Sequence, residues 1–315
     1  MRDVAVIATS FLHEESAARD EVELIHAVVS DALSQVPKAA DRIGFVCSGS
    51  ADLLIGRPFS FVQGLDGIGA WPPVSESHVE MDGAWAFLEA WTRLQLGDID
   101  AALVYCFARP SAGTFSDVSV LQMDPYVMAP LWPDADTLAD LQADAMAAAQ
   151  GRENAENTGS SAHKVVDGAA ALVLAAGSVA ENAEKRAWIA GLDHRVEAHA
   201  LGARELGRSV STKVAAQHAW VQTRPIATGY VTASHSHALE LVGGALKEAG
   251  LNDGAQLSAT DFTPMVTGLS NICRAANDVM EKRAIASLAH ASSGACLQHN
   301  LVCVLESNHK MGLAQ

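Results

Sequence analysis

The feature that most constrains the fold of this chain is an apolar stretch that must be buried on all sides. Residues 83–96 read GAWAFLEAWTRLQL, and apolar residues occupy most of the circumference of the helix that they predict. Gly97 ends that helix, and residues 99–107 (IDAALVYCF) follow as a strand with apolar residues on both faces, which is typical of a parallel sheet with helices packed over it. The chain is therefore expected to form a layered α/β structure around a buried helix.

Strands and helices alternate in both parts of the chain. This order favours two related halves, residues 1–164 and 165–315, stacked with the covered helix between their sheets. A shortened, irregular region at about 109–164 is expected to be a loop region containing one Ala-rich helix, and a further loop is expected at 54–73. The expected strands are 4–10, 42–48, 99–107, 165–177, 187–196, 285–291 and 300–306, and the expected helices are 21–36, 83–96, 137–150, 237–250 and 271–283.

Charge and cysteine content exclude several classes of function. The chain has 315 residues, 49% of them hydrophobic, and a net charge of −16, so we expect neither a nucleic acid nor an anionic membrane as its partner. Its five cysteines form no CxxC pair and no cluster with metal spacing, which favours a reducing compartment and predicts no metal site. The N-terminal run VAVIATS is too short for a signal sequence or for a span of about 20 residues, and a cytoplasmic protein is expected.

Three motifs, in order along the chain, resemble the thiolase superfamily. Gly83 is followed by Ala86 and by Gly97-Asp98 at the spacing of the central thiolase helix; VVDGAAALVLA (165–175) is similar to the D-G-A-A-A strand; and Gln298-His299-Asn300 looks like the Q-H-N run of sterol carrier protein type thiolases and the related lipid-transfer-protein thiolases. The resemblance implies a layered α/β/α/β/α sandwich, at least a dimer, and an acyl-CoA substrate class such as a steroid or lipid side-chain thioester. No tightly bound cofactor is expected, and coenzyme A enters only as a thioester substrate or ligand.

The same resemblance implies a degenerate catalytic site. Three residues before Gly83, where the family has its nucleophilic Cys, this chain has Glu80, and a carboxylate is a far poorer acyl acceptor than a thiolate. The family's G-H-P loop corresponds to 257–268, which keeps Pro264 without the His. The H-D-C-F turn falls on His235-Ser236-His237 by spacing. Thiolysis through a covalent intermediate is therefore not expected.

Two interpretations remain open for the acids before the central helix. Glu80 and Asp82 can cap the helix by accepting hydrogen bonds from its free N–H groups. Alternatively, Glu80 points into the former nucleophile pocket, as a general base or as a group that blocks acylation. Likewise, His235, His237 and Tyr230 form either a proton-transfer cluster or incidental contacts.

A cationic stretch contrasts with the acidic chain. Between residues 195 and 224, five Lys and Arg residues face only two glutamates. Arg204, Arg208 and Lys213 in particular are candidate ligands for the phosphates of coenzyme A, or else part of a solvated or partner-binding face.

Three functions follow as hypotheses. The first is a thiolase-like subunit without nucleophilic catalysis that supports a catalytic partner, either a second thiolase-like chain or an assembly that includes an OB-fold protein. The second is an autonomous carbon-carbon lyase of the retro-aldolase type, with Glu80, Tyr230, His235 or His237 as proton carriers and backbone amides that stabilise the enolate. The third is a binding module for lipid or acyl-CoA. Whether the chain is itself an enzyme stays open.

Overall fold

The computed structural model describes residues 1–16, 18–69, 74–152, 161–219, 225–251 and 254–308. Within these ranges the strands form one sheet in the order β3-β2-β4-β5-β1-β6-β10-β9-β7-β8. The last five strands repeat the order of the first five in reverse. Each half therefore has its third strand at the outer edge and its first strand at the middle of the sheet. The strands are β1 (Val4–Glu14), β2 (Ile43–Gly49), β3 (Ser75–Val79), β4 (Ala101–Ala108), β5 (Asp167–Ala176), β6 (Ala187–Val196), β7 (Thr228–Val231), β8 (Gln256–Ser258), β9 (Ala286–Ser293) and β10 (His299–Glu306).

A narrow seam joins the two half-sheets. β1 and β6 pair only at Ala5 with Trp188 and at Val6 with Ala187, whereas β1 and β5 pair along almost their whole length. β5 also pairs with β4, so it belongs to the first half-sheet, whereas the expected C-terminal half begins at residue 165 and would include it. We propose that the halves divide between β5 and β6.

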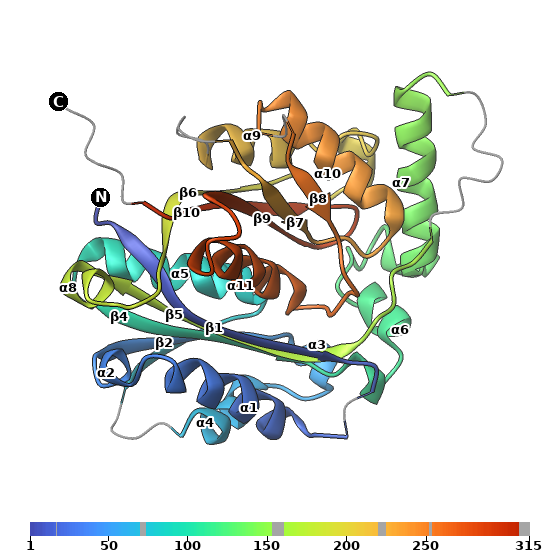
Figure 1. Cartoon of the computed structure of the whole chain (residues 1–315). Coiled ribbons are helices and arrows are strands. Elements are labelled where there is room, and N and C mark those ends of the chain that lie inside the picture. Colours follow the sequence, from blue (N-terminus) through green and yellow to red (C-terminus); the bar gives the residue numbers. More distant parts are fainter. Residues whose placement is uncertain (17, 70–73, 153–160, 220–224, 252–253, 309–315) are drawn as a thin grey trace.

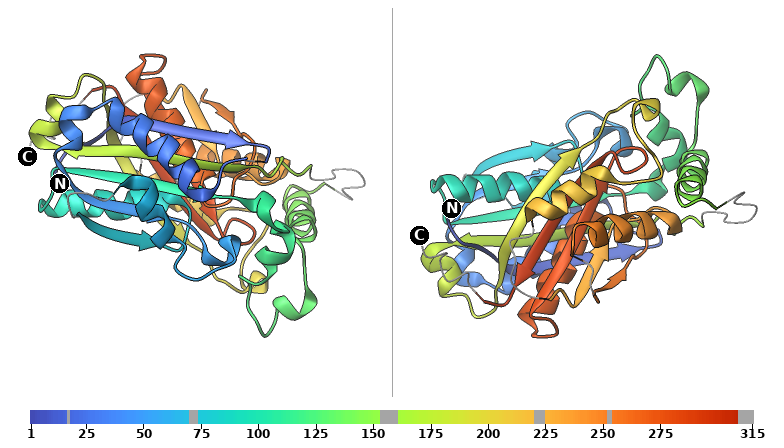
Figure 2. Two further views of the ribbon diagram at one scale, coloured as in Figure 1. Left: turned by 90° about the horizontal axis from the view of Figure 1, so that it is seen from below. Right: turned by 90° about the horizontal axis from the view of Figure 1, so that it is seen from above.

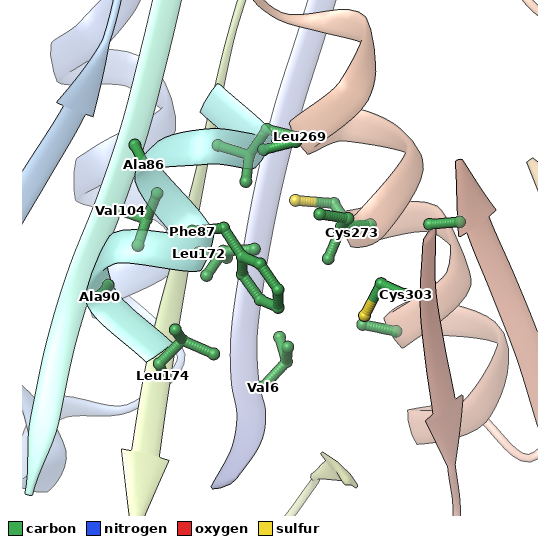
Figure 3. Packing of buried hydrophobic residues seen from close by; sticks show 14 of the residues in the cluster. Val6, Ala86, Phe87, Ala90, Val104, Leu172, Leu174, Leu269, Cys273 and Cys303 are labelled. Carbon is green, nitrogen blue, oxygen red and sulfur yellow. The ribbon is translucent and has the colours of Figure 1, made fainter. Parts of the chain in front are cut away.

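Two helices fill the space between the half-sheets. α5 (Gly83–Leu96) and α11 (Thr267–Met280) lie side by side there, with one half-sheet below and the other above (Figure 1). Phe87 of α5 packs with Leu269 and Cys273 of α11 and with Leu172 of β5 in a continuous apolar core (Figure 3). The prediction of a layered α/β sandwich around a covered helix is confirmed.

Further helices cover the outer faces. α1 (Glu21–Ser34) and α4 (Phe61–Ile68) pack over the first half-sheet, while α9 (Val210–Ala219) and α10 (Ser236–Glu248) cover the second (Figures 1 and 2). The apolar residues of α1 recur at helical spacing, so that its inner side is buried in a second apolar core. The shorter helices are α2 (Pro37–Ala40), α3 (Asp52–Ile55), α6 (Phe115–Val120) and α8 (Gly177–Glu181), with 3-10 turns η1 (Pro110–Ala112), η2 (Ala129–Leu131) and η3 (Leu201–Ala203).

Close backbone approaches fix the start of α5. A Cβ atom on Gly83 would lie 2.6 Å from Cys106 Sγ on β4, and one on Gly49 would lie 2.8 Å from the Gly83 Cα atom. Only glycines let the end of β2 approach the first turn of α5 so closely. At the other end, Gly97 adopts a φ of 82°, a left-handed conformation that ends the helix.

The structure departs from the expected elements mainly outside the core. The expected loop at 54–73 contains α4, and β3 follows it as a polar edge strand that the sequence pattern did not predict. The irregular region holds α6 and then α7 (Ala135–Ala149), which begins two residues before its expected start. α11 begins at Thr267, four residues earlier than expected, with buried polar residues in its first turn.

Candidate functional site

A cavity of about 190 Å³ opens beside the first turns of the two central helices. Its walls come from distant parts of the chain: Asp82, the segment 115–142, residues 199 and 201, residues 234–238, residues 262–265 and residues 292–298. Residues 234–238 include the start of α10, and residues 262–265 come just before α11. Segments from both halves of the chain therefore enclose one site at the start of the central helices.

Asp82 lines this cavity at the N-terminus of α5. Its side chain caps α5 by accepting a hydrogen bond from the Ala84 N–H at 2.8 Å. The same carboxylate accepts from the Gly268 N–H at 3.0 Å and the Leu269 N–H at 3.2 Å, which belong to the first turn of α11. Burial raises the pKa of Asp82 to about 6, while these three amides oppose the rise. One carboxylate thus occupies the N-termini of both central helices.

Glu80 lies outside the cavity. Its side chain is 52% exposed, and it accepts a hydrogen bond from the Asp52 N–H at 2.5 Å. Its second oxygen lies 3.3 Å from the Nε2 atom of His78. Neither expected role, the cap of the central helix or a group inside the pocket, agrees with this position. Counting three residues back from Gly83 therefore does not lead to the acid that lines the cavity, and bends at residues 80 and 81 separate Glu80 from Asp82.

His235 and His237 do line the cavity together. Their ring centroids are 6.1 Å apart, and both side chains are more than nine-tenths buried. His235 Nε2 lies 3.0 Å from Asp136 Oδ1, and His237 Nε2 lies 3.1 Å from Gln142 Oε1, so each contacts α7. Burial, aided by the neighbouring His235, lowers the pKa of His237 to about 4 and keeps it neutral at pH 7.

Tyr230 belongs to a different cluster. Its hydroxyl donates to Asp278 Oδ2 at 2.8 Å, and Asp278 also accepts from Thr228 and Arg283. Burial and the hydrogen bond to Asp278 raise the pKa of Tyr230 to about 12. Tyr230 is not among the described residues that line the cavity, so the structure does not bring it together with the two histidines.

The three candidate phosphate ligands have different surroundings. The Arg204 side chain is only 7% exposed and donates to Ala295 O and Cys296 O, both at 2.8 Å, while Glu197 lies 3.6 Å away as its counter-ion. Arg208 and Lys213 are on the surface and share Glu248 at 3.1 Å and 3.0 Å. Arg224, the last cation of the expected patch, lies outside the described residues. Arg204 therefore holds the cavity wall at 295–296.

That wall has an unusual backbone. Gly294, Cys296 and Leu297 all have positive φ values of 76°, 51° and 58°. For the two residues other than glycine this conformation costs free energy, so external contacts must hold it. Arg204 provides two such contacts, and Asn300 provides another by donating from Nδ2 to Leu297 O at 2.7 Å.

Replacing Arg204 by methionine should therefore loosen the wall. Cys296 is the one cysteine of the five that is only partly buried, so its rate of alkylation by iodoacetamide, followed by peptide mass spectrometry, reports on this wall. We expect an increase of about tenfold in Arg204→Met, because a wall that opens for about 1.4 kcal/mol less is open ten times as often. Arg208→Met is the matched control and should react like wild type. Equal rates in both variants, or faster reaction of all five thiols through global unfolding, would contradict this role.

Thiolate chemistry has no support in this site. Cys296 lines the cavity, but burial raises its pKa to about 11, and its Sγ atom donates to Leu138 O at 3.6 Å. The other four thiols are buried. In the part of the chain that the structure describes, no group of three metal-binding side chains is found, and no helix is long and apolar enough to cross a membrane.

Two similar five-stranded half-sheets enclose two central helices, with a cavity at the helix N-termini. This is the thiolase fold, as comparison with solved structures shows. Over 99% of this chain and 78% of the other, the fold matches a monomeric SCP2-thiolase-like protein type 1 from Mycobacterium smegmatis, with a TM-score of 0.71 at 14% identity. It matches an Ltp2-ChsH2(DUF35) aldolase over 98% and 99% of the two chains, with a TM-score of 0.72 at 13% identity.

A third solved structure shares the fold. Human mitochondrial 3-ketoacyl-CoA thiolase, solved in complex with CoA, matches over 98% of both chains with a TM-score of 0.66 at 14% identity. A scan against protein-family models finds no match, and neither does a search of curated proteins. The similarity is therefore one of fold.

Proposed function

We propose that this chain binds an acyl-CoA thioester in the cavity, as a cytoplasmic thiolase-fold subunit that forms no acyl-enzyme and supports a catalytic partner in an assembly of at least two chains. One observation carries the proposal: the Asp82 carboxylate already accepts the N–H groups at the starts of α5 and α11. A thiolate nucleophile depends on such helix N-termini to lower its pKa. With those donors taken by a fixed anion, covalent thiolysis loses its activating field.

The cavity walls suit the acyl part of a thioester. Phe115, Leu138 and Met265 give the cavity apolar surface, while Ser234 and the two histidines give it polar groups. Apolar walls with a few polar groups are typical of small-molecule sites. Two of the similar structures support the proposed ligand and the proposed partner. One is a thiolase in complex with CoA, and the other is an aldolase that includes a DUF35 protein.

A second candidate function rests on two proton carriers in one cavity. Asp82, with its pKa raised to about 6, can accept a proton near neutral pH, and neutral His237 can accept or donate one. A non-covalent retro-aldol cleavage of a hydroxyacyl-CoA needs a base for the hydroxyl proton and donors for the enolate oxygen. In this candidate Asp82 replaces Glu80 as the base.

Ligand binding and turnover separate these functions. The protein alone is titrated calorimetrically with CoA, a saturated acyl-CoA and a β-hydroxyacyl-CoA of a lipid or steroid side chain, and intact mass is recorded after each incubation. We expect acyl-CoA to bind more tightly than CoA, with no added acyl mass and no release of CoA or aldehyde. Acyl-CoA affinity no better than that of CoA would exclude the proposed binding site.

Asp82→Asn distinguishes the supporting subunit from the lyase. In a binding subunit we expect acyl-CoA affinity within about threefold of wild type, whereas an autonomous lyase would lose turnover by about 100-fold or more and lose the corresponding limb of its pH profile. Glu80→Gln is the matched control, because Glu80 lies outside the cavity. Turnover by the isolated wild-type chain that falls in Asp82→Asn and persists in Glu80→Gln would replace the first proposal with the second.

A further inference from the structure

The segment between β4 and α7 has two apolar sides. Its inner side contributes Phe115, Met123 and Met128 to the cavity wall. Its outer side exposes large apolar side chains within a stretch of twelve residues, with Tyr126 at 88% and Leu131 at 74%. We call this outer side the apolar patch; its members are Leu121, Tyr126, Val127, Leu131 and Trp132.

The patch is a formed surface. Asp124 Oδ1 accepts from the Tyr126 and Val127 N–H groups at 2.9 Å and 2.6 Å, and Asp124 O accepts from Ala129 N at 2.9 Å. These bonds fold 124–129 into a turn that holds Tyr126 and Val127 outward. Single exposed apolar residues are ordinary on proteins, but five large ones in one short segment mark a contact surface.

Charge limits what can cover the patch. Residues 110–149 contain six Asp residues and no Glu, Lys or Arg. A second copy of this chain would bring the same acids into a symmetric contact, and an anionic membrane would be repelled as well. A surface with apolar side chains flanked by Lys or Arg satisfies both the patch and the surrounding acids.

We propose that the apolar patch is the docking surface for a partner protein that presents apolar side chains flanked by basic residues. The proposal rests on the supporting role proposed above and assigns it a place on the molecule. Because residues 115–128 also form the cavity wall, a partner bound there contacts the outer side of the segment whose inner side contacts the ligand.

The chemistry of the patch is tested with two helical peptides, one of Leu and Lys and one of Leu and Glu, whose binding is followed by fluorescence anisotropy. The variant Tyr126→Ser/Leu131→Ser removes apolar area and keeps every charge. We expect the Leu/Lys peptide to bind this variant at least tenfold more weakly than wild type, and the Leu/Glu peptide to bind neither. Ile285→Ser, at a residue that is 58% exposed elsewhere, is the matched control and should bind like wild type. If the Leu/Lys peptide binds wild type and both variants equally, its binding depends on net charge alone, and the proposal is overturned.

Native mass at endogenous expression tests the surface in its own assembly. We expect wild type and Ile285→Ser to be isolated as a complex with a second chain, and Tyr126→Ser/Leu131→Ser to be isolated without it. High salt should separate the second chain from wild type. A wild-type assembly that the patch variant leaves intact, a homomer that the variant dissolves, or a chain that runs alone would each overturn it. The isolated patch variant should still bind acyl-CoA. If wild type itself fails to bind acyl-CoA, that result counts against the proposed function and not against the docking surface.

Discussion

Gly268→Ala should destabilise the protein by about 3 to 5 kcal/mol, because the new methyl group has no space at the start of α11. A Cβ atom at this position would lie 2.3 Å from Asp82 Oδ1 and 2.6 Å from the Ala291 Cβ atom. The side chain can be accommodated only if Asp82 moves, which breaks its hydrogen bonds to the first turn of α11. The free energy of unfolding in urea at pH 7 measures the effect.

Gly244→Ala provides the matched control. Gly244 is in α10, and a Cβ atom there would meet nothing within 4 Å. Alanine inside a helix is more favourable than glycine by about 0.5 to 1 kcal/mol, so this variant should be slightly more stable than wild type. Similar unfolding free energies for the two variants would mean that the contact between Asp82 and α11 is not rigid.

Mild acid should destabilise the protein strongly through three histidines that are partly or fully buried. Burial is the largest cause that lowers the pKa of His13, His237 and His290 to about 4, from 6.5 for an unperturbed histidine. Between pH 6.5 and 4 the folded protein therefore binds fewer protons than the unfolded chain, and the stabilisation present above pH 6.5 is lost as the pH falls through 4. By pH 5 each histidine should cost about 2 kcal/mol. Asp82 acts in the opposite direction, since its raised pKa lets the folded state bind an extra proton below pH 6, worth about 1 kcal/mol at pH 5.

His290→Gln isolates one of these contributions. His290 is fully buried, and its Nε2 atom lies 2.9 Å from Asn300 Oδ1, a contact that a glutamine amide can keep. The loss of unfolding free energy between pH 7.5 and pH 5 should be smaller by about 2 kcal/mol in this variant than in wild type. His26→Gln, on the exposed side of α1, is the matched control. An identical pH dependence in all three proteins would show that His290 is accessible to protons in the folded state.

The layers of the fold could be predicted because burial on all sides leaves a strong pattern. The apolar circumference of 83–96 and the apolar strand after it correctly indicated a helix between sheets. β3 was missed because its sequence, SESHV, is polar, as an edge strand with one free side can be. β7 and β8 have only four and three residues, too few for a period of two to appear.

The site was predicted less well, since contacts between distant residues decide it. Spacing identified His235 and His237 correctly as neighbours, because both lie at the start of one helix. Capping was expected of both Glu80 and Asp82, and the structure shows it for Asp82. Only the role inside the pocket was given to Glu80, by counting back from Gly83, whereas the acid that lines the cavity is Asp82. Counting charges grouped Arg204 with Arg208, and no local pattern shows that only Arg204 turns inward to the backbone at 295–296.

The position of Asp82 also bears on whether this fold could be given the chemistry of a thiolase. A cysteine at position 80 would face Asp52 on the surface, where Glu80 now lies, and would not reach the cavity. A cysteine at position 82 would reach it but would remove the negative charge that joins α5 to α11. Covalent catalysis at this site would thus need a nucleophile and a new link between the helices at once. Single substitutions are therefore a poor route to thiolase chemistry on this chain.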